Sequence, residues 1–166
     1  MRILGIDPGL AITGYGLINS CGKNIKLMEA GIIRSSTKDK MEKRLADIYK
    51  KVMNLIRDTM PEAVVLEELY SHYKHPKTSI LMAHGRGAIC LAVKHGNVTL
   101  VNYPTTKIKK AITGRGRASK EQVQRTVASL LGLKKPPEPV DITDALALAI
   151  THANIWGHRN DLQGFR

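Results

Sequence analysis

The chain has little cysteine and no long apolar run. Its two cysteines, Cys21 and Cys90, lie far apart and lack the spacing of metal ligands, which argues against a disulfide scaffold and a thiolate zinc site. We expect free, mostly buried thiols in a reducing cytoplasm. No apolar stretch approaches the roughly 20 residues of a membrane-spanning helix, and Met1 runs directly into a first strand without a signal peptide. The sequence therefore predicts a cytoplasmic protein without a membrane partner.

Acidic residues are scarce as well, with 14 Asp and Glu against 26 Lys and Arg in 166 residues. The resulting net charge of +12 and pI near 9.9 favour a polyanion such as nucleic acid as the partner. The length suits one domain with its own hydrophobic core. We expect this domain to span residues 1–155, followed by a loose polar C-terminal tail over residues 156–166.

The pattern of apolar residues predicts both strands and helices. Short apolar runs predict strands over residues 3–7, 13–20, 25–34, 63–66 and 98–103. Helical spacing and helix boundary signals predict helices over residues 41–60, 78–95, 105–113, 119–131 and 141–155. Ser119 and Gln122 have the spacing of a capping box at the start of the fourth helix. This order predicts an α/β fold: a mixed five-stranded sheet, its first three strands antiparallel, flanked by helices.

A few acids follow apolar runs and are the candidates for a functional site. Asp7 ends a buried strand at a Pro-Gly turn, and Glu67 and Glu68 follow the wholly apolar run at residues 63–66. Asp141 and Asp144 are spaced i, i+3, so they share one face of a helix. Carboxylates gathered in this way hold a hard cation such as Mg²⁺.

Each of these acids also has a structural interpretation. Asp141 could be an N-cap with Asp144 in the first turn, where the helix dipole favours both. Glu67 and Glu68 could be polar residues that end a strand. Asp7 is harder to explain structurally, because an acid behind a buried strand is costly unless it is paired or bound to a metal.

A segment without acids, from residue 107 to residue 120, predicts contacts with DNA. The glycines at positions 114 and 116 favour adaptation of the backbone to phosphates, and the capped helix start at Ser119 offers amide donors. The alternative is a solvated helix face with a flexible turn. Tyr70, which lies among cations, suits an unstacked base but could equally be a rim residue of the core. The basic residues of the segment are Lys107, Lys109, Lys110, Arg115, Arg117 and Lys120.

Several motifs, in this order and at matching length, resemble the RuvC family of Holliday-junction resolvases. The first are Ile-Leu-Gly-Ile-Asp-Pro-Gly at residues 3–9 and Thr-Gly-Tyr-Gly at residues 13–16. The others are Val-Leu-Glu-Glu-Leu-Tyr at 65–70, Gly-Arg-Gly at 85–87, Lys-Glu-Gln-Val-Gln at 120–124 and Asp-Ile-Thr-Asp-Ala-Leu-Ala-Leu-Ala-Ile at 141–150. At residues 83–85 the chain reads Ala-His-Gly, where the family often has Gly-Gln-Ala.

The resemblance implies a ribonuclease-H-like fold and an endonuclease that resolves four-way (Holliday) DNA junctions by paired symmetric nicks, in recombination and repair. The family's four metal-binding acids fall on Asp7, Glu67, Asp141 and Asp144, which selects Glu67 over Glu68. Its aromatic residue falls on Tyr70, and its basic residues near the site fall on Lys109 and Lys120. We also expect Arg86 to contact DNA and Lys120 to be catalytic.

The same resemblance implies the cofactors and partners. We expect two Mg²⁺ ions per subunit, with Mn²⁺ as an alternative, to activate water and stabilise the leaving oxygen. A four-way junction is two-fold symmetric and takes two matched cuts, so we expect a homodimer with an isologous interface. Family membership further suggests a junction-binding and branch-migration helicase complex as a partner.

Other functions fit parts of the sequence. The Gly-Ile-Asp-Pro-Gly motif at residues 5–9 also resembles the first phosphate loop of actin-like ATPases and sugar kinases. Those proteins need a second comparable domain, for which 166 residues leave no room. A junction-binding protein without catalysis would be expected to lack some of the four acids. A nuclease of the same fold that cuts RNA–DNA hybrids stays open.

Overall fold

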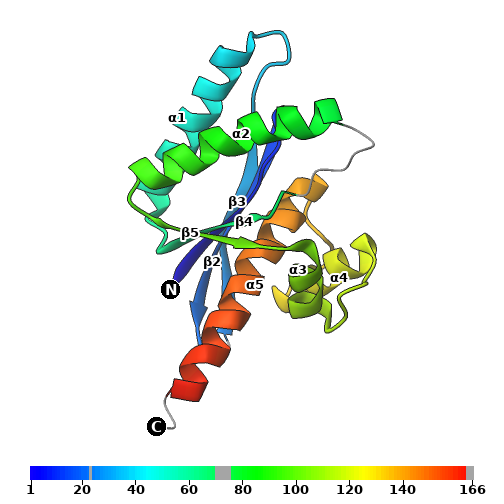
Figure 1. Ribbon diagram of the computed structural model, residues 1–166. Coiled ribbons are helices and arrows are strands. Elements are labelled where there is room, and N and C mark those ends of the chain that lie inside the picture. Colours follow the sequence, from blue (N-terminus) through cyan, green and yellow to red (C-terminus); the bar gives the residue numbers. More distant parts are fainter. Residues whose placement is uncertain (23, 70–75, 164–166) are drawn as a thin grey trace.

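The computed structural model describes residues 1–22, 24–69 and 76–163, with Pro76 and residues 158–163 described by backbone alone. A single five-stranded sheet in the order β3-β2-β1-β4-β5 forms the centre of the described fold (Figure 1). The first three strands are antiparallel neighbours, and β4 and β5 extend the sheet in parallel to β1. This is the predicted mixed sheet. The strands are β1 (Arg2–Asp7), β2 (Ile12–Cys21), β3 (Asn24–Arg34), β4 (Ala63–Glu67) and β5 (Thr99–Tyr103).

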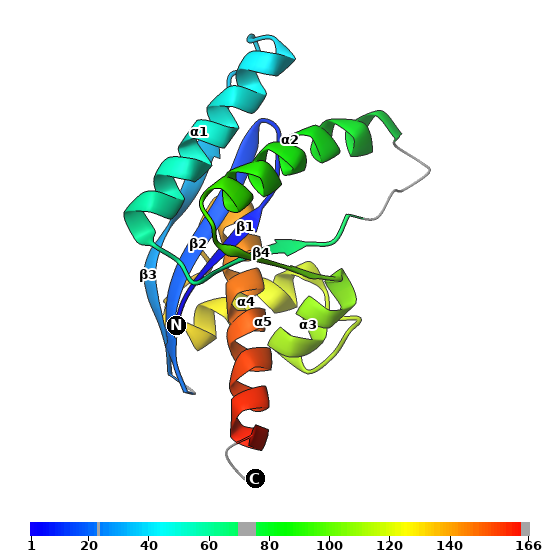
Figure 2. The same cartoon turned by 60° about the vertical axis from the view of Figure 1, so that its left-hand side comes forward.

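Helices cover both faces of the sheet (Figures 1 and 2). Two of them, α1 (Met41–Thr59) and α2 (Pro76–His95), lie on one face. On the other face α5 (Val140–Gln163) crosses the sheet, with α3 (Thr105–Thr113) and α4 (Lys120–Leu130) packed beside it. The helices agree with the predicted segments within about two residues, except at the end of α5.

The last helix corrects one prediction. We expected a helix that ends at residue 155 and a loose tail from residue 156, but α5 continues to Gln163. No proline interrupts residues 156–163, and the single Gly157 costs a helix only about 1 kcal/mol. The ring of Trp156 stacks on that of His152, one turn earlier, with the centroids 6.1 Å apart. The polar composition of the segment was therefore a poor guide to its backbone.

The two cysteines are free, as predicted, but one of them is not buried. Cys21 is exposed at the end of β2, and Cys90 on α2 is half-buried. The expectation of mostly buried thiols was wrong for Cys21, because it ends the strand beside the β2–β3 connection and outside both core clusters. Within the described ranges, no helix is long and apolar enough to cross a bilayer.

Alternate strand residues enter two separate cores. Ile3 and Val65 pack with α3, α4 and α5, whereas Leu4 and Val64 pack with α1 and α2. This follows from the two-residue period of a strand, which turns successive side chains to opposite faces. Residues 63–66 are all at most 1% exposed, which confirms that this apolar strand is covered on both faces.

Two glycines decide how closely α5 approaches the sheet. A Cβ atom on Gly5 would lie 1.9 Å from the carbonyl oxygen of Ala145, and one on Gly14 would lie 2.1 Å from that of Asp141. Both distances are far inside van der Waals contact, so no larger residue fits without moving the helix. Gly14 is also the register partner of Asp7 in the β1–β2 pair. The absence of side chains here lets the first turn of α5 lie against the end of β1.

Candidate active site

Three elements bring the candidate acids to one edge of the sheet. Asp7 is the last residue of β1 and Glu67 the last residue of β4. These strands are parallel, so their carboxyl ends meet at the same edge. The helix α5 begins at Val140, which puts Asp141 inside its first turn rather than at the N-cap, with Asp144 one turn further on.

A pocket of about 250 Å³ opens between these elements. Asp7, Glu67 and Asp144 line it together with two cations, Lys109 of α3 and Lys120 of α4. Neither Asp141 nor Glu68 is part of the lining, so the structure brings Glu67 rather than its neighbour to the pocket. The remaining lining residues are Thr105, Ile108, Val123, Ala147 and Leu148.

Asp7 lies at the electrostatic centre of the acids. Its pKa is raised from 3.8 to about 7, mostly by burial and then by the charges of Asp144, Asp141 and Glu67, in that order. Lys120 acts in the opposite direction but does not cancel it. The four acids predicted from the sequence therefore interact as one cluster, which concentrates negative charge in a strongly basic chain.

Lys120 is the cation in direct contact with this cluster. Its Nζ lies 2.8 Å from Oδ2 of Asp144, and this hydrogen bond raises the pKa of the lysine. The predicted capping box is confirmed: the amide of Gln122 donates to Ser119 Oγ over 3.2 Å, and the amide of Ser119 donates to Gln122 Oε1 over 2.9 Å. Because Lys120 is the first residue of α4, this cap fixes the backbone from which the lysine reaches Asp144.

The cluster has the donor chemistry of a hard-cation site. All four candidate ligands are carboxylates, the oxygen donors that Mg²⁺ prefers. As the side chains stand, no three His, Cys, Asp or Glu of the described residues converge closely enough to ligate one ion. Lys120 holds an oxygen of Asp144, and the hydroxyl of Thr105 donates to Oε1 of Glu67. Each of these contacts engages one oxygen of a carboxylate that has two.

Arg86 points toward the protein rather than away from it. From α2, its Nη1 donates to the carbonyl oxygen of Glu67 over 2.6 Å. Its Nη2 donates to Oδ1 of Asn102, near the end of β5. The side chain expected to contact DNA thus lies behind a candidate metal ligand.

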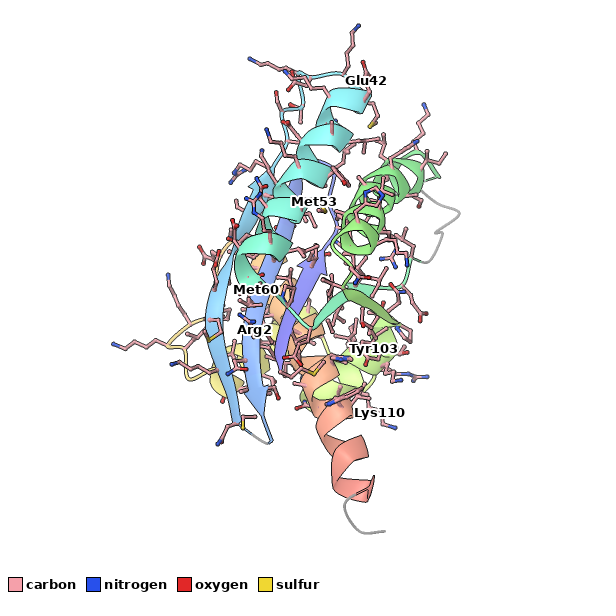
Figure 3. All side chains as sticks on the ribbon, turned by 90° about the vertical axis from the view of Figure 1, so that its left-hand side faces the viewer. Arg2, Glu42, Met53, Met60, Tyr103 and Lys110 are labelled. Atoms are coloured by element: carbon pink, nitrogen blue, oxygen red, sulfur yellow. The ribbon has the colours of Figure 1, made fainter. Side chains whose placement is uncertain are left out.

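The other predicted DNA contacts are distributed around α3. Lys107 and Lys110 are exposed on this helix, and Nζ of Lys107 lies 5.1 Å from the ring centre of Tyr103. Figure 3 shows Lys110 and Tyr103 beside α5 in the lower half of the view, whereas Glu42 lies at the top. Gly114 ends α3 with a φ of 75°. Beyond it Arg115 and Arg117 are exposed. The predicted aromatic contact, Tyr70, lies outside the described residues.

Two residues near the site were not predicted from the sequence: Thr105, which donates to Glu67, and Asn102, which accepts from Arg86. Thr105 follows Pro104 at the start of α3 and looks in the sequence like an ordinary helix start. Asn102 lies in a short strand whose pattern says nothing about its partner. Neither position carries a local signal, because each contact is made across 16 or more residues of sequence.

The sequence matches the family described as "Crossover junction endodeoxyribonuclease RuvC" over residues 3–152. The chain belongs to the RuvC family. The RuvC protein of Rhodopirellula baltica is 43% identical over 148 residues, which cover 89% of this chain and 83% of the relative. That of Caldicellulosiruptor saccharolyticus is 42% identical over 153 residues, covering 92% of each.

Solved structures agree with this assignment. The chain is similar to the Thermus thermophilus RuvC structure with a TM-score of 0.88 and 31% identity, over 96% of this chain and 97% of that one. It is also similar to T. thermophilus RuvC in complex with a Holliday junction substrate, with a TM-score of 0.85 and 28% identity, over 94% and 95%. The yeast mitochondrial Holliday junction resolvase Ydc2, at 14% identity and a TM-score of 0.69, shares the fold. The predicted ribonuclease-H-like fold is confirmed.

Proposed function

We propose that this protein is a crossover junction endodeoxyribonuclease that resolves four-way DNA junctions by hydrolysis. Its RuvC relatives carry that name over most of the chain, and one similar structure is described as a complex with a Holliday junction substrate. The observation that carries the proposal is the gathering of Asp7, Glu67 and Asp144 in one pocket, in a chain of net charge +12. A cationic body suits DNA, and an isolated acidic site suits divalent cations.

Hydrolysis of a phosphodiester has two requirements that the site must meet. A phosphodiester is anionic and repels hydroxide, so hydrolysis needs positive charge at the phosphate and an activated water. Two bound Mg²⁺ ions, or Mn²⁺ in their place, would supply both. Asp7, Glu67, Asp141 and Asp144 are the residues that would hold them. Lys120 has a rigid backbone and a charged Nζ at the pocket, so we assign it to stabilising charge on the phosphate.

The cationic surface around α3 is proposed to bind the DNA backbone. Lys109 lines the pocket, and the exposed basic residues extend from it along α3 and the following turn. Phosphate contacts of this kind release counterions, so affinity for the junction should fall steeply with salt. Tyr70 is assigned to stacking on an unpaired base. The proposed phosphate contacts are Lys107, Lys109, Lys110, Arg115, Arg117 and Lys120.

The helix α2 offers a face for a second copy of the chain. Four large apolar side chains on it are exposed, by 37–57%. A two-fold axis at this face would make an isologous dimer with two sites, as paired cuts in a symmetric junction require. A branch-migration helicase complex is proposed as a further partner on family grounds alone. The exposed side chains are Ile80, Leu81, Met82 and Leu91.

One experiment separates the candidate functions. The protein is incubated with a synthetic four-way junction, a plain duplex and an RNA–DNA hybrid, each with and without Mg²⁺. A resolvase cuts the junction alone, in two symmetric strands, and only with the metal. Preference for the hybrid would instead indicate a ribonuclease of the same fold, and binding without any cutting would indicate a junction-binding protein.

A further inference from the structure

Arg86 joins three elements behind the pocket. It projects from α2, which crosses the face of the sheet near β4 and β5 (Figure 2). Its Nη1 donates to the carbonyl oxygen of Glu67 over 2.6 Å, and its Nη2 donates to Oδ1 of Asn102. Asn102 is the register partner of Leu66, so one guanidinium bridges neighbouring parallel strands at their carboxyl ends.

This is the point where the β4–β5 ladder ends. The last register pair is Glu67 with Tyr103, and one further bond runs from the amide of Glu68 to the carbonyl of Tyr103 over 2.9 Å. That bond holds the peptide that joins Glu67 to Glu68, and among the described residues no further β4–β5 pair follows it. The planar fork of an arginine can satisfy two acceptors at fixed angles, which a lysine cannot.

The side chain of Glu67 is held from the same direction. The hydroxyl of Thr105 donates to its Oε1, and Thr105 follows β5 by two residues. Two residues of the stretch from Asn102 to Thr105 therefore act on Glu67. Thr105 contacts its carboxylate directly, and Asn102 contacts the arginine that binds its carbonyl oxygen. Arg86 is half-buried and makes both of its described bonds to protein oxygens.

We propose that Arg86 is a positioning residue for Glu67 rather than a contact to DNA. By fixing the end of β4, it directs the Glu67 carboxylate into the pocket and sets the site's affinity for divalent cations. The proposal rests on the proposed function for its cleavage readout, and it has a second readout that does not depend on cleavage.

The test compares Arg86→Ala and Arg86→Lys with Arg57→Ala, which removes the same charge from an exposed position on α1. Three quantities are measured: junction affinity in EDTA, the cleavage rate of the enzyme-saturated junction against Mg²⁺ concentration, and the rise in Tm that Mg²⁺ causes. We expect both Arg86 variants to bind the junction in EDTA as Arg57→Ala does. Their saturated cleavage rate or apparent Mg²⁺ affinity should fall by about 10- to 100-fold, and their Tm should respond less to Mg²⁺.

A double-mutant cycle with Asn102→Ala tests whether Arg86 acts through its contact with Asn102. If the guanidinium acts through this contact, Arg86→Ala with Asn102→Ala should be no worse than Arg86→Ala alone. Should Arg86→Ala fail to fold, Arg86→Lys and the exposed Asn102→Ala carry the same measurements. Weakened affinity in EDTA with an unchanged cleavage rate and Tm response would make Arg86 a DNA contact and overturn the proposal. If the wild type does not cut the junction, the proposed function fails, and the Tm response alone then decides the role of Arg86.

Discussion

Lys120 and Asp144 form an ion pair in the lining of the acidic pocket, with Nζ 2.8 Å from Oδ2. The pair joins the capped start of α4 to the second turn of α5. Lys120 lowers the pKa of Asp7, but the charges of Asp144, Asp141 and Glu67 raise it and outweigh this effect together with burial. A cluster in this state favours added positive charge, from metal ions or from protons.

The first prediction concerns Lys120→Ala. Because Lys120 reaches the pocket from a rigid helix start, its loss should slow cleavage by about 100-fold or more while junction affinity changes little. Arg125→Ala, which removes a charge from an exposed position on the same helix, is the control and should cleave as the wild type does. Single-turnover cleavage and gel-shift affinity measure both effects. Normal cleavage by Lys120→Ala would remove it from the catalytic residues.

The second prediction follows from the pKa of Asp7, which burial and the neighbouring acids raise from 3.8 to about 7. The folded metal-free protein binds this proton more tightly than the unfolded chain, so stability falls as pH rises from about 4 to about 7. Asp7→Asn has no such proton to lose. We measure the free energy of unfolding in urea with EDTA present. As pH rises over this range, that of the variant should increase relative to that of the wild type. A difference that is independent of pH would contradict the raised pKa.

The third prediction concerns metal and stability. Divalent cations that bind the folded cluster and not the unfolded chain should raise Tm by mass action. The rise in Mg²⁺ should be clear for the wild type and smaller for Asp7→Asn, because one ligand and one charge are lost. Differential scanning fluorimetry over a Mg²⁺ titration measures it. Equal shifts in the two proteins would count against a metal site at Asp7.

The fourth prediction tests the contact between the sheet and α5. Gly14→Ala would place a methyl group 2.1 Å from the Asp141 carbonyl, so the helix must move. We expect a loss of about 1–3 kcal/mol or more in the free energy of unfolding, and slower cleavage because Asp141 and Asp144 shift. Gly87→Ala on α2 meets nothing within 4 Å and is the control, with stability equal or slightly higher. Tolerance of both substitutions would show that α5 does not need this close contact.

Much of the site could be predicted because its acids carry local signals. Asp7 ends a short apolar strand at a Pro-Gly turn. The carboxyl ends of parallel strands lie at the same edge of a sheet, so acids at such ends lie near one another. Glu67 could not be separated from Glu68 by pattern alone, since both follow the same run; the resemblance to the RuvC family selected it. Asp141 and Asp144 share a helix face by spacing, but only the fold shows that this face meets the end of β1.

Other features depend on contacts between distant parts of the chain. The direction of Arg86 is decided by oxygens of Glu67 and Asn102, 19 and 16 residues away, so its charge alone suggested DNA. The need for glycine at position 14 comes from the backbone of α5, which no local pattern reveals. The polar composition of residues 156–163 predicts a tail, but the segment contains no proline and α5 continues to Gln163.

Junction cleavage by Asp144→Asn, measured beside its junction affinity, tests most directly whether the acidic cluster is the catalytic centre. The amide keeps the size of the side chain and removes its charge, so the cationic DNA surface is left intact. We expect cleavage to be slower by about 100-fold or more, with affinity close to that of the wild type. Undiminished cleavage by this variant would contradict the claim that the acidic cluster is the catalytic centre.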